Sequence, residues 1–126
     1  MRMMTLSEWT IEFFLEHDGT APVAEFLDSL DSKTQARFRW SIEQLRLRNT
    51  SARAPLVKHL DGDLWELREE SSTNIYRVIY VFFTGRRIVL LHGFQKKTQK
   101  TPFRELDIAR RRHKDFLNRE QRRSMQ

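Results

Sequence analysis

The sequence contains no cysteine among its 126 residues, so neither disulfide bonds nor thiolate chemistry are available to it. It also lacks any apolar run near the roughly 18 residues that a membrane span requires, and its N-terminus has no signal-peptide core. We therefore expect no membrane partner and a cytoplasmic location. The four histidines are scattered without metal-ligand spacing, and glycine-rich phosphate loops and a nucleophile elbow are absent. We predict neither a metal nor a cofactor.

Positive charge is what the sequence has in excess. The 23 Lys and Arg residues outnumber the 17 Asp and Glu residues, for a net charge of +6. Such an excess favours an acidic partner, most commonly nucleic acid, although it also serves solubility. Hydrophobic residues make up 39% of the chain and charged residues 32%, which is typical of a folded globule. The length predicts a single domain over residues 1–126.

The first half of the chain predicts one strand and two helices. Residues 9–16 are apolar and aromatic enough for a strand that ends at the Asp18-Gly19 turn. A short helix follows Pro22, and a second helix is capped by Asp31 or Ser32. The arginines and lysine of this second helix fit a solvated face better than a binding face. The helix breaks over residues 49–55.

The second half of the chain predicts three successive strands, at residues 64–68, 75–83 and 87–94, with Gly85 in the second turn. A last helix begins at Thr101 as N-cap and Pro102 as first residue, and the basic tail at about 119–126 is expected to fray. The order predicts an α+β domain. Its sheet is mainly antiparallel with about four strands, and it carries two N-terminal helices and one C-terminal helix.

Alternation along the strands places Glu66 and Arg68 on one face. Arg77 lies inside an otherwise apolar central strand, where its charge is costly unless it reaches solvent, a carboxylate or a ligand phosphate. Two interpretations stay open for Arg77: a phosphate site, or a salt bridge to Glu66 or Glu69 that stabilises the sheet.

His92 is predicted on the same side of its strand as Ile88, Leu90 and Phe94, which favours a half-buried scaffold histidine over a proton-transfer group. Beyond this strand lie Lys96, Lys97 and Lys100, either as a solvated cluster or as phosphate ligands. The run Arg110, Arg111 and Arg112 spreads around more than one helix face, so part of it is solvated and part is open to RNA or to an acidic partner.

Five segments carry a resemblance to a known family: GTAPVAEFLDSL, LWELR, YRVIYVF, LLHGFQKKTQKTP and ELDIARRR, in this order. The chain resembles the HigB/RelE-type toxins of bacterial type II toxin–antitoxin systems, and most closely their phage-related HigB-like branch. The resemblance implies a ribosome-dependent endoribonuclease, or mRNA interferase, that cleaves translated mRNA by metal-free attack of the 2′-hydroxyl on the phosphate. It also implies a toxin that is monomeric alone and forms a larger assembly with a helix-turn-helix, HigA-like antitoxin.

The resemblance implies a cleavage-site arginine at Arg77 and substrate-binding cations at Lys96 and Lys97, and the residue patterns above add the other candidates. The expected catalytic residues are Arg77, Lys97, Arg68, His92 and Glu66, and the expected RNA-binding residues are Arg68, Lys96, Lys97, Lys100, Arg110 and Arg111. Arg77 and then Lys97 are the strongest catalytic candidates. The chain departs from the RelE pattern where Leu64 and Glu66 stand in place of lysines and Phe103 in place of a tyrosine.

Two other functions remain open from the sequence. A ParE-like relative would poison DNA gyrase by protein contact, and it would lack convergent basic residues on its sheet. A non-catalytic nucleic-acid-binding or regulatory module is kept open by the missing lysines and tyrosine.

Overall fold

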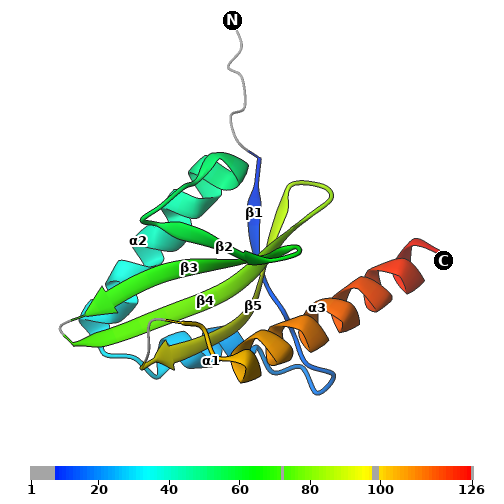
Figure 1. Cartoon of the computed structure of the whole chain (residues 1–126). Helices are drawn as coiled ribbons and strands as arrows, with labels where there is room; N and C mark the ends of the chain where they lie inside the picture. The colour runs from blue at the N-terminus through cyan, green and yellow to red at the C-terminus, as the bar shows by residue number, and fades with distance from the viewer. Residues whose placement is uncertain (1–7, 72, 98–99, 126) are drawn as a thin grey trace, which may run out of the picture.

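The computed structural model describes residues 8–71, 73–97 and 100–125. Figure 1 shows the path of the chain. Its elements are β1 (Thr10–Phe13), α1 (Pro22–Asp28), α2 (Ser32–Arg48), a 3₁₀ turn η1 (Asn49–Ser51), β2 (Val57–Asp61), β3 (Leu64–Ser71), β4 (Asn74–Phe83), β5 (Arg87–Lys96) and α3 (Phe103–Ser124). Over the described ranges, no helix is both long and apolar enough to cross a membrane.

The strands form one mixed sheet in the order β1-β5-β4-β3-β2. β1 pairs with β5 in parallel, and the other neighbours are antiparallel. The α+β class is confirmed, but the expected count of about four strands is wrong, because the sheet has five. The strand that we missed is the edge strand β2, in which Lys58, His59 and Asp61 are exposed. An exposed polar edge strand lacks the apolar alternation that identifies a strand in sequence.

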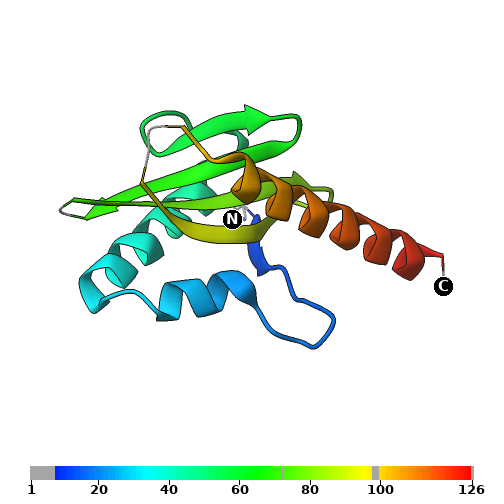
Figure 2. The same ribbon diagram turned by 60° about the horizontal axis from the view of Figure 1, so that its bottom comes forward.

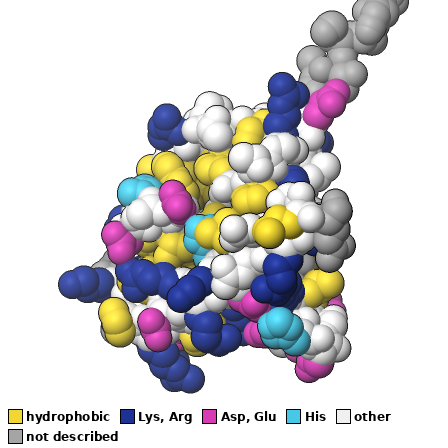
Figure 3. All heavy atoms as spheres, turned by 90° about the vertical axis from the view of Figure 1, so that its right-hand side faces the viewer, with side chains coloured by type: hydrophobic (Ala, Val, Ile, Leu, Met, Phe, Trp, Pro, Cys, Tyr) yellow, Lys and Arg dark blue, Asp and Glu magenta, His cyan; other side chains and the backbone are white. Residues whose placement is uncertain are grey.

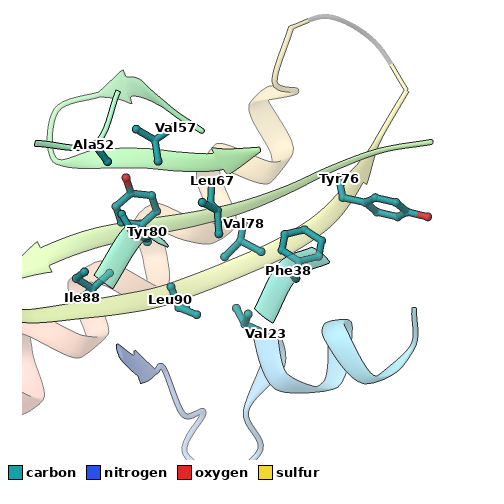
Figure 4. Packing of buried hydrophobic residues seen from close by; sticks show 11 residues of the cluster. Val23, Phe38, Ala52, Val57, Leu67, Tyr76, Val78, Tyr80, Ile88 and Leu90 are labelled. Carbon is teal, nitrogen blue, oxygen red and sulfur yellow. The ribbon is translucent and has the colours of Figure 1, made fainter. Parts of the chain in front are cut away.

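The helices are divided between the two faces of the sheet, whereas the sequence pattern assigns them to no particular face. Figure 2 shows α1 and α2 on one side and α3 on the other. One core lies between the sheet and the first two helices and includes Val23, Phe38, Val78 and Leu90 (Figure 4). A second core lies under α3 and includes Ile79, Val89, Ala109 and Phe116.

The starts of the first two helices follow the sequence, whereas the start of the third does not. Pro22 opens α1, and Asp31 caps α2 by accepting a 2.9 Å hydrogen bond from the Thr34 backbone N–H. In α3 the N-cap is Pro102, without a side-chain cap, and not Thr101 as predicted. The Thr101 hydroxyl instead reaches across to a carboxylate on β3. α3 extends through Ser124, so it includes residues 119–124 of the segment expected to fray.

A β-bulge in β5 changes the face on which His92 lies. Ile79 pairs with His92, but the next residue, Tyr80, pairs with Leu90, so one extra residue stands in β5. His92 and Phe94 therefore lie on the α3 face, whereas Leu90 belongs to the core under α1 and α2. The expectation that His92 shares a side with Ile88 and Leu90 is wrong, because simple alternation does not hold across a bulge.

Candidate functional site

Strand register brings four charged side chains together on the α3 face. Arg68 of β3 pairs with Arg77 of β4, and Glu66 lies two residues before Arg68, on the same side. Lys96 of β5 pairs with Ile75, which again shares this face with Arg77. We call Glu66, Arg68, Arg77 and Lys96 the Glu66 cluster. In Figure 1, α3 starts beside β5 and runs away from the ends of β3 and β5 that carry this cluster.

Glu66 is the centre of the cluster and is fully buried. Its Oε2 lies 3.4 Å from Arg77 Nε and 4.0 Å from Arg68 Nε. Its Oε1 accepts a 3.0 Å hydrogen bond from the Thr101 hydroxyl. The salt bridge between Arg77 and Glu66 was one of the two interpretations open for Arg77. Glu69 is not its partner, because Glu69 faces α2 and accepts a 2.7 Å hydrogen bond from Ser41.

The cations of the cluster differ in depth. Arg77 is 3% exposed and Lys96 is 5% exposed, whereas the side chain of Arg68 is 32% exposed. An anion arriving from solvent therefore meets Arg68 first. Arg77 and Lys96 are buried on the neighbouring strands β4 and β5, where lower solvent screening strengthens their field.

Burial lowers the pKa of both deep cations. Desolvation is the main cause for the Arg77 guanidinium, with the charge of Arg68 adding to it and the carboxylates of Glu66 and Glu70 opposing it. Desolvation also lowers the pKa of the Lys96 ammonium, and the nearby charges of Arg77, Arg68 and Lys58 lower it further against the attraction of Glu66. The cluster therefore holds three cations, Arg68, Arg77 and Lys96, against the one carboxylate of Glu66. An anionic ligand would neutralise the excess positive charge.

Two residues of this region were missed by the sequence analysis. Lys58 of β2 pairs with Glu66, and Thr101 donates to Glu66. The Asp61-Gly62 turn between β2 and β3 is the feature of the sequence that could have identified Lys58, because a hairpin centred there places Lys58 opposite Glu66. The role of Thr101 had no local signal, since its partner is 35 residues away in the chain.

His92 is engaged by α3 through both ring nitrogens. Nε2 lies 2.6 Å from Glu105 Oε1, Nδ1 lies 3.2 Å from the Arg112 guanidinium, and the ring stacks on Phe94. Burial lowers the pKa of His92, and the hydrogen bond to Glu105 opposes this effect. These contacts favour the scaffold interpretation of His92 over proton transfer.

Comparison with protein families identifies a match over most of the chain. Residues 25–114 match the model of the family described as "Phage derived protein Gp49-like (DUF891)". The chain belongs to this family. The Gp49-like family is associated with toxin–antitoxin systems, and the matched segment contains the whole Glu66 cluster. A comparison with curated proteins gives no match.

The remaining predicted residues of this Gp49-like chain lie outside the cluster. Lys97 and Lys100 are exposed beyond the end of β5. Arg110 forms an ion pair with Asp61 in the β2–β3 turn, and Arg111 is exposed on α3. Figure 3 shows Lys and Arg side chains interspersed with acidic ones on the side of the molecule where α3 ends. The basic residues of α3 are therefore partly neutralised by ion pairs.

The described residues contain no group of three or more His, Cys, Asp or Glu side chains that could hold a metal ion. The chemistry that the Glu66 cluster offers consists of charge stabilisation by two guanidinium groups and proton donation by an amine. Both fit a phosphodiester as the ligand.

Proposed function

We propose that this Gp49-like protein is the toxin of a type II toxin–antitoxin pair and acts as an mRNA interferase on ribosome-bound mRNA. In this proposal a helix-turn-helix antitoxin neutralises it, and the protein acts in the cytoplasm. The observation that carries the proposal is the Glu66 cluster, in which a buried carboxylate positions two arginines beside a buried lysine. Membership of a toxin-associated family supports it.

In the proposed reaction, the 2′-hydroxyl of the RNA gives its proton to solvent water and its oxygen attacks the neighbouring phosphate. The bond from phosphorus to the 5′-oxygen breaks, which leaves a 2′,3′-cyclic phosphate on one product and a 5′-hydroxyl on the other. Arg68 binds a non-bridging oxygen of the phosphate from the solvent side. Arg77 and Lys96, which are buried, stabilise the extra negative charge of the pentavalent transition state. Lys96 is also the proton donor to the leaving oxygen, because its lowered pKa makes proton release easier than from an ordinary lysine.

Glu66 serves in this proposal to position the arginines. Its Oε1 accepts a hydrogen bond from Thr101, its Oε2 faces Arg77 and Arg68, and the residue has no exposed surface. A carboxylate so placed fixes the guanidinium groups more readily than it accepts a proton from RNA. The family resemblance favours Lys97 over Lys96, whereas the proposal favours Lys96, because β5 continues to Lys96 and buries it.

The first experiment is induction of the chain alone in a bacterial host, with mapping of mRNA 5′ ends during the first minutes. The proposal expects growth arrest and new cuts at in-frame positions of translated messages. Arrest with intact mRNA and accumulated DNA breaks would support the ParE-like alternative. Absence of arrest would favour the non-catalytic module.

A set of variants tests the residue roles in the same assay. Lys96→Met and Arg68→Ala should abolish the cuts, whereas Lys97→Ala should retain most of them. Arg86→Ala is a matched control, since Arg86 is an exposed arginine in the β4–β5 turn, at the far end of the strands that carry the cluster. Loss of cutting in Lys97→Ala with full activity in Lys96→Met would restore the order predicted from sequence.

A further inference from the structure

A groove of about 510 Å³ lies on the α2 side of Arg68. Its walls are Trp40, Gln44 and Arg48 on α2, Pro55 and Leu56 before β2, and Arg68 on β3. We call it the α2 groove. Arg68 also belongs to the Glu66 cluster, so the groove and the cluster have this residue in common.

The exposed face of Trp40 is the most unusual feature of this groove. Trp40 is 61% exposed although it is a large aromatic side chain on a helix that packs against the sheet. Aromatic side chains of this kind supply stacking platforms for unpaired bases, while arginines beside them hold the phosphates. Arg48 and Arg68 line the same groove as Trp40.

The acidic residues of the groove differ in availability. Ser41 donates a 2.7 Å hydrogen bond to Glu69, so part of that carboxylate is already engaged. Glu70 is exposed at the rim, and its backbone carbonyl accepts from Arg37. The two arginines and the indole are thus accompanied by one exposed carboxylate, an acceptor that a base amino group can use.

We propose that the α2 groove is a second nucleotide subsite, in which a base of single-stranded RNA stacks on Trp40 and its phosphate lies between Arg48 and Arg68. The inference rests on the proposed function, since the strand is the one whose neighbouring phosphate occupies the Glu66 cluster. The exposed indole of Trp40 and continuity with the Glu66 cluster through Arg68 favour RNA over a protein segment as the occupant.

The test measures binding of a labelled six-nucleotide RNA by fluorescence anisotropy. The RNA carries 2′-O-methyl groups, so the 2′-oxygen cannot attack and the strand stays intact. Trp40→Ala should weaken binding by about 5-fold or more, which is the lower end of the range for loss of one stacked base, and Trp40→Phe should restore most of it. Leu47→Ala is the control, because Leu47 is 50% exposed on the same helix and does not line the groove.

A second measurement ties the effect to the base. With an oligonucleotide that lacks the base at the stacked position, Trp40→Ala should have no further effect on affinity.

If Trp40→Ala binds like the wild type while Arg68→Ala is weakened, the inference is overturned and the proposed function stands. Absence of RNA binding by the wild type also overturns the inference, and 5′-end mapping then decides separately on the nuclease. A concentration-dependent dimer that Trp40→Ala abolishes in sedimentation velocity would assign the groove to a second copy of the chain instead.

Discussion

Glu66 shows how a single side chain can hold a cationic site together. It is fully buried and lies within 3.4 Å of Arg77, which is itself 3% exposed. A buried ion pair contributes little net stability, but removal of one partner leaves an uncompensated charge in a medium of low polarity. If Glu66 loses its charge, Arg77 and Lys96 remain as buried cations without a neutralising carboxylate, which destabilises the folded state.

We predict that Glu66→Gln lowers the free energy of unfolding by about 3–5 kcal/mol, the range for breaking a buried pair. The reason is that the amide keeps the shape of the side chain and removes the charge that faces Arg77 and Arg68. Urea unfolding followed by far-ultraviolet circular dichroism measures the change.

The control for this prediction is Glu70→Gln, two residues after Arg68, where the side chain is exposed. That substitution should change the free energy of unfolding by no more than about 0.5 kcal/mol. Equal effects of the two substitutions would contradict the buried position of the Glu66 charge.

Much of the cluster could be predicted from alternation. The sequence placed Glu66 and Arg68 on one face and identified Arg77 as a charge in need of a partner, and the register confirms both. The order of Lys96 and Lys97 depends on where β5 ends, which alternation does not define once the apolar residues stop. Thr101 could not be found locally, because its partner lies on another strand.

Gly93 controls how closely α1 approaches the sheet. A Cβ atom at Gly93 would lie 2.3–2.9 Å from atoms of the Phe26 ring, closer than real contacts allow. Phe26 comes from α1 and packs against the core under the first two helices. This one position therefore fixes the distance between α1 and β5.

We predict that Gly93→Ala destabilises the protein by about 1–3 kcal/mol, the usual cost of overpacking a core. The ring of Phe26 has to move, and α1 moves with it. Thermal unfolding measures the loss, and the double variant Gly93→Ala/Phe26→Leu should recover part of it. A double variant that is less stable than the sum of the two single changes would contradict the steric explanation.

Two histidines make the attachment of α3 depend on pH. His92 joins β5 to Glu105 and Arg112, and His113 is half-buried on α3 itself. Burial lowers the pKa of both below the ordinary value of 6.5. Between each lowered pKa and 6.5, the unfolded chain binds more protons than the folded one, so stability falls as the pH drops through this window.

We predict that the free energy of unfolding of the wild type decreases from pH 8 to pH 5.5 and that His92→Gln reduces this decrease. His113→Gln should act in the same direction, and the double variant should show the weakest dependence. Each variant is compared with its own value at pH 8, which removes the loss of packing from the comparison. A steeper pH dependence in His92→Gln would contradict a lowered pKa.

The elements could be predicted where hydrophobic pattern and local capping agree. Pro22 and Asp31 marked the starts of α1 and α2, and the long apolar runs marked β4 and β5. β2 could not be predicted, because its exposed polar residues show no periodic hydrophobic pattern. The face of His92 could not be predicted either, because the bulge in β5 interrupts the alternation of side chains. The assignment of helices to faces depends on packing between distant segments, which local pattern does not contain.

Across the molecule, the net charge of +6 and the Glu66 cluster would make separable contributions to the proposed RNA binding. Net charge acts over long distances and is screened by salt, whereas each phosphate contact releases counterions. For single-stranded nucleic acid, each contact changes the slope of log affinity against log salt concentration by about 0.7.

We predict that Arg68→Gln reduces that slope by about 0.7 and that Arg86→Gln leaves it unchanged, although both variants lose one positive charge. Arg86 lies in the β4–β5 turn, about 30 Å along β5 from the level of Lys96, given 3.3 Å per strand residue. Anisotropy titrations of the 2′-O-methyl six-nucleotide RNA between 50 and about 200 mM salt measure both slopes. Equal slopes for the two variants would mean that overall charge governs binding, and the Glu66 cluster would then lose its place as the phosphate site.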